Sequence, residues 1–224
     1  MNVLVLGGAG GIGQAVCHEV ANSGHRPIVV DRARVTQDWI EADLRDHERV
    51  AQVAGEVARR YGDVEALVNC AGVYRAQTLD TFTWNDFTES LRVNLHGPLR
   101  VMLDWCGSRE RGVLVNISSA AARTGSRDLS YSISKSAMEG ATRSLALSLV
   151  PRGFRVFAIA PHVVDSPMSR AMPEDRRDEQ VRRSLIAEPC PPEEVAALVG
   201  LMLSGRVDHL VGSSVNLSAG AVWV

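Results

Sequence analysis

Short runs of apolar residues alternate along the chain with longer segments in which apolar and polar residues are mixed. The short runs lack the polar alternation of a half-exposed strand, which predicts strands buried on both faces. They lie at residues 3–6, 27–30, 66–68, 113–116, 156–160 and 215–217. Helices are predicted between them, at about residues 14–22, 47–61, 84–105, 134–150 and 191–204. Strands that alternate with helices are typical of βαβ units, so we predict a parallel sheet with helices on both faces.

Residues 166–192 are the one segment that does not follow this alternation. The segment is long for a connection in a compact domain, and charged side chains gather between Arg170 and Arg183. It is either a lid over a substrate or a solvated surface helix. No linker rich in proline, glycine or serine divides the 224 residues, so we predict one domain over residues 1–224.

Composition excludes several classes of protein. With 46% hydrophobic and 22% charged residues, the chain has the composition of a globular protein and not of a disordered one. A net charge of −2 argues against a nucleic-acid or anionic membrane partner, and no apolar run reaches the ~18 residues of a membrane span. The four cysteines form no CxxC pair, and the histidines show no metal-ligand spacing. We expect a cytoplasmic protein without a signal peptide or a metal site.

Three glycines, Gly7, Gly11 and Gly13, lie between the first predicted strand and the first predicted helix. Glycines in this position let the backbone approach a pyrophosphate, which the helix N-terminus stabilises. Asp31 ends the second predicted strand, where a carboxylate accepts the ribose hydroxyls of adenosine and repels a 2′-phosphate. This favours NAD(H) over NADP(H). Arg32 is adjacent and could pair with a 2′-phosphate, so NADP(H) remains the alternative.

Tyr131 and Lys135 are four residues apart, and Lys135 is the only lysine among the 24 basic residues. On a helix the two side chains lie on one face, so an ammonium would stand beside a phenol. A nearby positive charge favours the phenolate and tunes a tyrosine toward acid–base work. Ser118 and Ser119 follow a predicted strand of the parallel sheet, at the edge where such sheets bind ligands. Either hydroxyl could hold a substrate oxygen beside the phenol.

These motifs make the chain resemble the short-chain dehydrogenase/reductase family along nearly its whole length. The matching segments are residues 6–13, Asp43-Leu44, residues 69–72, Asn94, residues 116–119, Tyr131 with Lys135, and residues 161–166. The resemblance implies a single-domain α/β Rossmann fold with a doubly wound, parallel, seven-stranded sheet of order 3-2-1-4-5-6-7. It also implies a homotetramer or homodimer that acts on a small-molecule substrate.

The resemblance assigns roles to individual residues. Its catalytic set corresponds to Asn94, Ser119, Tyr131 and Lys135. Its cofactor contacts correspond to Gly7, Gly11, Ile12, Gly13, Asp31, Arg32, Asp43, Leu44, Asn69, Ala71, Gly72, Tyr131, Lys135, Pro161, Val164 and Ser166. Tyr131 would exchange the proton, Ser119 would orient the substrate oxygen, and Lys135 would bind the nicotinamide ribose and depress the pKa of the phenol. Asn94 would hold a water that continues the proton path.

The chain departs from the family pattern at several positions. Leu6 replaces a threonine, Cys70 an asparagine, and His162 a glycine beside the nicotinamide; Phe157 and Ser218 replace an asparagine and an aspartate. His162 either fills space or borders the substrate. The chain also resembles, within the family, the 2,3-dihydro-2,3-dihydroxybenzoate dehydrogenases. Three arginines near the predicted pocket could receive a carboxylate or could be solvated, namely Arg75, Arg123 and Arg127.

Three functions are consistent with these residues. The first is hydride transfer between NAD(H) and a secondary alcohol or ketone, with a cyclic alcohol or a dihydrodiol as a candidate substrate. The second is an NADPH-dependent ketoreductase of a biosynthetic pathway, favoured if Arg32 outweighs Asp31. The third is a non-catalytic protein that uses the same fold to bind a dinucleotide without turning over a substrate. The apolar tail, residues 219–224, is either a subunit interface or folds back on its own subunit.

Overall fold

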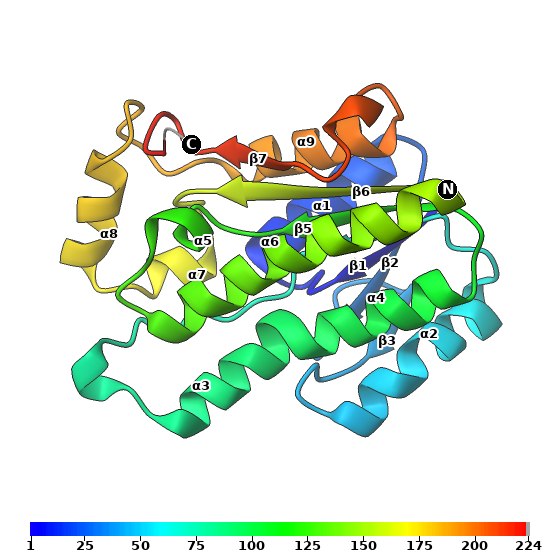
Figure 1. Cartoon of the computed structure of the whole chain (residues 1–224), viewed down its shortest axis with the longest axis horizontal. Coiled ribbons are helices and arrows are strands. Elements are labelled where there is room, and N and C mark those ends of the chain that lie inside the picture. The colour runs from blue at the N-terminus through cyan, green and yellow to red at the C-terminus, as the bar shows by residue number, and fades with distance from the viewer. Residues whose placement is uncertain (223–224) are drawn as a thin grey trace.

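The computed structural model describes residues 1–222 and contains a parallel sheet of seven strands in the order β3-β2-β1-β4-β5-β6-β7. The resemblance implied this order and this α/β Rossmann fold, and both are confirmed (Figure 1). The strands are β1 (Asn2–Leu6), β2 (Arg26–Asp31), β3 (Trp39–Glu41), β4 (Ala66–Asn69), β5 (Gly112–Ile117), β6 (Phe154–Pro161) and β7 (Ser214–Leu217).

Helices cover both faces of this sheet. The α-helices are α1 (Gly11–Asn22), α2 (His47–Tyr61), α3 (Trp84–Leu91), α4 (Gly97–Gly107), α5 (Ala121–Thr124), α6 (Leu129–Leu149), α7 (Pro167–Arg170), α8 (Glu174–Arg182) and α9 (Pro192–Leu203). Shorter turns are η1 (Leu79–Thr81), η2 (Arg92–His96), η3 (Val150–Arg152) and η4 (Asp208–Leu210), of which η2 is π-helical.

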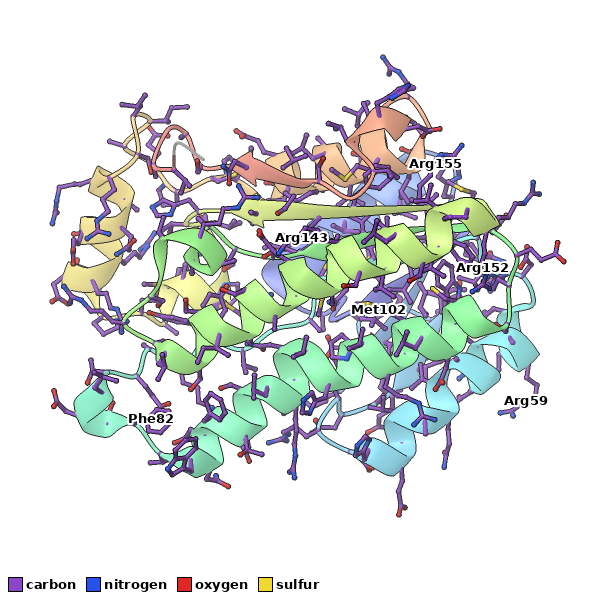
Figure 2. All side chains as sticks on the ribbon, viewed as in Figure 1. Arg59, Phe82, Met102, Arg143, Arg152 and Arg155 are labelled. Atoms are coloured by element: carbon purple, nitrogen blue, oxygen red, sulfur yellow. The ribbon has the colours of Figure 1, made fainter. Side chains whose placement is uncertain are left out.

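Successive side chains of the central strands point to opposite faces, and each face has its own core. Leu4 and Leu6 of β1 pack with α2, α4 and α6, whereas Val3 and Val5 pack with α1 and α9. Both faces are therefore apolar, which is why these strands read as continuous hydrophobic runs. In Figure 2, Met102 of α4 lies within the molecule, whereas Arg59 of α2 extends away from the ribbon.

Side-chain caps fix the starts of two helices, of which α6 contributes Tyr131 and Lys135 to the site. The Asp46 carboxylate accepts the backbone N–H groups of Glu48 and Arg49 at the start of α2. The Asp128 carboxylate accepts the backbone N–H of Tyr131 at the start of α6. The predicted helix over residues 134–150 therefore begins earlier, at Leu129, and Tyr131 lies in its first turn.

Two elements differ from the sequence prediction. The predicted helix over residues 84–105 is interrupted by the π-helical turn η2, which separates α3 from α4 and contains Asn94. The apolar pattern predicted six strands and missed β3, which is three residues long and carries one buried residue, Ile40. A strand of that length shows too little pattern for detection.

The polar segment after β6 folds into α7 and α8. Both helices lie beyond the carboxyl ends of the strands, where the arrowheads of β6 and β7 point in Figure 1. Val222 of the apolar tail is buried, whereas Trp223 and Val224, on which the tail prediction depended, lie outside the described residues. Within residues 1–222, the structure contains no helix of the length and apolarity that a bilayer span requires.

Candidate active site

A cleft of about 600 Å³ runs along the carboxyl ends of β1, β2 and β4. The glycine turn forms its floor, and only glycine fits at two of its positions. Gly7 has a φ of +74°, and a Cβ atom there would lie 2.7 Å from the Cα of Ala71. A Cβ atom on Gly13 would lie 2.1 Å from the Gly7 carbonyl oxygen. The turn therefore packs α1 tightly against β1 and leaves its backbone open to the cleft.

The adenosine end of this cleft carries both signs of charge. The Asp31 carboxylate accepts the backbone N–H of Ala9 at 3.0 Å, which fixes it beside the glycine turn, and Arg32 lines the cleft next to it. Arg45 hydrogen-bonds Asp43 through Nε at 3.1 Å and Nη2 at 2.6 Å, and this contact lowers the pKa of the Asp43 carboxyl group. Asp43 and Leu44 line the cleft, as the resemblance implied.

These features fit a dinucleotide. The cleft combines a glycine turn that a Cβ atom would block, the start of a helix, and a fixed carboxylate where adenosine hydroxyls would lie. The predicted cofactor residues that line the two cavities of the site are Gly7, Gly11, Ile12, Gly13, Asp31, Arg32, Asp43, Leu44, Ala71, Gly72, Tyr131, Lys135, Pro161, Val164 and Ser166.

Asn69 is the predicted cofactor residue that does not line either cavity. Its side chain is buried, donates to the Asn116 side chain at 3.3 Å and accepts the backbone N–H of Ala71 at 3.2 Å. Asn69 therefore holds the turn after β4 against β5 from below. The predicted cofactor contact of Asn69 stays a prediction; in the structure its amide bonds to the Asn116 side chain and to the backbone of Ala71.

Tyr131 and Lys135 lie on one face of α6, as their spacing predicted. Lys135 is 4% exposed, and its Nζ atom donates to the Ile117 carbonyl oxygen at 2.9 Å. The same Nζ atom lies 5.8 Å from the centroid of the Tyr131 ring. Gly72 makes room for the ammonium, since a Cβ atom on Gly72 would lie 3.4 Å from Nζ.

The structure separates the roles of the two adjacent serines. The Ser119 hydroxyl is hydrogen-bonded to the Tyr131 phenol. The Ser118 hydroxyl lies on the other side, 3.4 Å from the Lys135 carbonyl oxygen and 3.4 Å from the Glu139 carboxylate. Adjacent residues after a strand point in opposite directions, so one hydroxyl reaches the phenol. The geometry favours Ser119.

Burial shifts the pKa of both members of the Tyr131–Lys135 pair. It raises the pKa of the Tyr131 phenol, and the hydrogen bond from Ser119 opposes that rise. It lowers the pKa of the Lys135 ammonium to about 8. Within the chain alone, the hydrogen bond from Ser119 is a contact that opposes the raised pKa of the phenol. The predicted effect of the Lys135 ammonium on the pKa of the phenol stays a prediction.

Asn94 joins three segments around the site. Its amide nitrogen donates to the Val73 carbonyl oxygen at 3.0 Å and to the Ser134 hydroxyl at 2.9 Å, and its oxygen accepts the Val73 N–H at 2.7 Å. The side chain thus ties η2 to α6 and to the loop after β4. A Cβ atom on Gly72 would lie 3.7 Å from the Asn94 oxygen and 3.4 Å from the Lys135 ammonium, so both groups approach this glycine. The predicted water contact of Asn94 stays a prediction.

A second cavity of about 160 Å³ opens above the phenol. It shares Ile12, Gly72 and Tyr74 with the larger cleft, so the two cavities meet beside Tyr131. His162 borders the smaller cavity, and its Nε2 atom lies 2.9 Å from the Gln180 carbonyl oxygen of α8. His162 therefore contacts both the cavity and the segment that covers it.

The three arginines considered as carboxylate receptors all have acidic neighbours. Arg75 pairs with Asp86 and Glu89, Arg123 with Glu139, and Arg127 with Glu179. Tyr74 and Arg176 are among the cavity residues that were not singled out from the sequence. Their signals were a lone tyrosine after the Asn69–Gly72 motif and one arginine within a charged run, and neither pattern distinguishes a cavity from solvent. Residues 1–222 contain no cluster of three potential metal ligands.

Residues 1–177 match the sequence model of the family described as short chain dehydrogenase, in agreement with the geometry of the site. The chain belongs to this family. This short-chain dehydrogenase is 32% identical to the short-chain reductase protein NovJ of Streptomyces niveus, over 97% of this chain and 92% of NovJ. It is 27% identical to an acetoacetyl-CoA reductase of Allochromatium vinosum, over 97% of this chain and 96% of the relative.

A solved structure of another short chain dehydrogenase has the same fold. The short-chain dehydrogenase superimposes with a TM-score of 0.88 on a short chain dehydrogenase of Burkholderia cenocepacia in complex with NADP; the two are 28% identical, with 98% of this chain and 96% of the other covered. Family membership identifies the protein as an NAD(P)-dependent oxidoreductase that acts on CH–OH or ketone groups. It does not narrow the family to the dihydrodihydroxybenzoate dehydrogenases.

Proposed function

We propose that the protein transfers a hydride between NAD(H) and a secondary alcohol or its ketone, with Tyr131 as the proton acceptor and donor. One observation carries this proposal. The Tyr131 phenol, hydrogen-bonded to Ser119 and one helical turn from the buried Lys135, stands where the dinucleotide cleft meets the smaller cavity. A small molecule in that cavity can reach the phenol and the nicotinamide end of the cleft together.

The residues divide the chemistry among themselves. The Ser119 hydroxyl orients and polarises the substrate oxygen, and Tyr131 takes the hydroxyl proton during oxidation or returns it to the carbonyl oxygen during reduction. The buried Lys135 ammonium supplies the one lysine charge near the phenol and would hold the nicotinamide ribose. The dinucleotide, when bound, supplies the hydride acceptor or donor at its nicotinamide ring. Val164 and Ser166 border the cavity that would hold the carboxamide.

The lid and the assembly belong to the same proposal. Residues 166–192 form the lid, because α8 is held over the cavity by the contact of its Gln180 carbonyl with His162 and by the pairing of Glu179 with Arg127. We expect a homotetramer or homodimer in the cytoplasm. Exposed apolar side chains on α6, including Ile133 and Leu147, support an assembly that covers this helix.

The cofactor preference gives a prediction. Replacing Asp31 with serine should lower kcat/KM for NAD and raise it for NADP, changing their ratio by about 10- to 100-fold, because the charge that repels a 2′-phosphate is removed. Arg32→Ser should move the ratio the other way. Initial rates with both cofactors measure the ratios. An unchanged ratio in Asp31→Ser contradicts the NAD assignment.

An NADPH-dependent ketoreductase is the second candidate. Arg32 and Arg45 both line the adenosine end of the cleft, and the Burkholderia cenocepacia structure is a complex with NADP. A screen of cyclic and linear secondary alcohols and their ketones, with each cofactor in turn, tests both candidates through the absorbance of the reduced nicotinamide. Turnover with NAD supports the first, turnover with NADPH alone supports the second, and no turnover with any of them overturns the proposed function.

A further inference from the structure

Arg176, on α8, is a buried cation that has no acidic partner among the described residues. Its side chain is 6% exposed. Its Nη1 atom donates to the Ala76 carbonyl oxygen at 2.8 Å, whereas its Nη2 atom is buried and has no hydrogen-bond partner within residues 1–222. Two acids of the segment between β6 and α9 pair with other arginines: Glu179 with Arg127 and Arg183, and Asp165 with Arg170 and Arg177.

A buried guanidinium of this kind lacks both a counter-charge and part of its hydrogen bonds. Burying a charge costs free energy unless a counter-charge and hydrogen bonds compensate for the lost hydration. Arginine is almost never fully buried without a partner, and the fixed fork of its five N–H donors matches a carboxylate in a bidentate geometry. The unpartnered Nη2 atom of Arg176 therefore indicates that a second group, absent from the chain itself, completes the site.

Arg176 stands in the cavity above the phenol. It lines the same 160 Å³ cavity as Tyr131. The Tyr74 ring connects the two, since its centroid lies 5.0 Å from that of Tyr131 and 5.5 Å from the guanidinium carbon of Arg176. A molecule that reaches the phenol with its hydroxyl group can therefore extend along Tyr74 toward the guanidinium.

We infer that Arg176 binds a carboxylate of the substrate, so that the enzyme acts on small hydroxy acids or the corresponding oxo acids. This inference rests on the proposed function, because it names the substrate class of the same site. The other arginine in the cavity, Arg127, already pairs with Glu179, so Arg176 supplies the counter-charge. A cavity of about 150 Å³ holds a benzene ring, so this cavity has room for a six-membered ring or a short chain beside the phenol.

A carboxylate site at Arg176 also gives a role to the position of this arginine on α8, within the lid. Arg176 comes from α8, whose residues Glu179 and Gln180 contact Arg127 and His162, and both of these also line the cavity. A carboxylate bound to Arg176 would add a further connection between the lid and the substrate. The enzyme would thus couple lid closure to the negative charge of its substrate.

Matched pairs of substrates test the inference. Each pair is a hydroxy acid and its neutral amide, which differ in charge and hardly in size: 3-hydroxybutyrate, 4-hydroxypentanoate and 3-hydroxycyclohexanecarboxylate, each with its carboxamide. For the pair with the highest activity, we expect kcat/KM of the wild-type enzyme to favour the acid by about 100-fold, since the amide leaves the buried cation unpaired. In Arg176→Met that preference should fall to within about threefold, because the variant has no cation that distinguishes the acid from the amide.

The adjacent arginine provides the control. Arg177 is more exposed, pairs with Asp165 at 3.9 Å and does not line the cavity, so Arg177→Met should keep the 100-fold preference. Arg176→Lys retains the charge and loses the fork, and it should keep about a tenth of the preference. Thermal unfolding of each variant reports whether it folds, and Arg176→Lys decides the test if Arg176→Met does not fold.

The outcomes separate the two proposals. If wild type oxidises acids and amides equally well, or if Arg176→Met loses activity toward both equally, Arg176 only braces Ala76 and Tyr74, and the carboxylate assignment is overturned while the proposed function stands. If wild type oxidises no acid, amide or unsubstituted secondary alcohol with either cofactor, the proposed function itself is overturned.

Discussion

Replacing Tyr131 with phenylalanine should lower kcat by about 10³-fold or more and leave the affinity for NADH nearly unchanged. The substitution removes one oxygen atom, which is the group that exchanges the proton, and keeps the ring that packs against Tyr74. Ser119 alone cannot replace it, because its hydroxyl is a far weaker acid than a phenol. Steady-state rates and the fluorescence of bound NADH measure the two quantities.

The control for this substitution is Tyr61→Phe. Tyr61 lies at the end of α2, its hydroxyl is buried, and it lines neither cavity. The same change of a hydroxyl there should leave kcat within about twofold of wild type. Normal turnover in Tyr131→Phe would overturn the assignment of this phenol as the acid and base.

Replacing Lys135 with methionine should lower kcat/KM by more than about 100-fold and make the protein more stable at pH 7. Burial lowers the pKa of Lys135 from 10.5 to about 8. At pH 7 the Lys135 side chain is charged in both the folded and the unfolded protein. Burying this charge costs free energy in the folded state alone, so it lowers the free energy of unfolding. That free-energy cost is about 3 kcal/mol at most, and a neutral methionine side chain at this position avoids it.

The stability gain has a defined pH window. Between pH 8 and pH 10.5 the unfolded chain binds the Lys135 proton and the folded chain releases it, so this residue makes wild type more stable as pH rises. Loss of the bond to the Ile117 carbonyl reduces the gain in Lys135→Met. We therefore expect a Tm about 2–8 °C above wild type at pH 7, shrinking by pH 10. A lower Tm at pH 7 would contradict the account.

Much of the fold could be predicted from the sequence, because both faces of the central strands are covered. Residues 3–6 and 66–68 are apolar without a break for that reason, whereas the three-residue strand β3 on the edge carries no such pattern. The π-helical turn at Asn94 was not predicted, since it depends on contacts of the Asn94 side chain with Val73 and Ser134 that are far away in sequence.

The parts of the site that could be predicted are those whose residues have a characteristic spacing in the sequence. Tyr131 and Lys135 at helical spacing and the glycine turn were found in this way. The choice between Ser118 and Ser119 needed the direction of each side chain, and the pKa of Lys135 needed its depth. Arg176 stood in a run of charged residues that reads as solvated, and its burial arises from the packing of α8 over the cavity.

The pH dependence of the wild-type enzyme in both directions tests the central claim most directly. Because burial raises the pKa of Tyr131, the phenolate that oxidation requires is the minor form at neutral pH. We expect kcat/KM for alcohol oxidation to rise about tenfold per pH unit from pH 6 to 8, and kcat/KM for ketone reduction, which requires the protonated phenol, to stay level over the same range. An oxidation rate independent of pH would show that no such phenol accepts the proton.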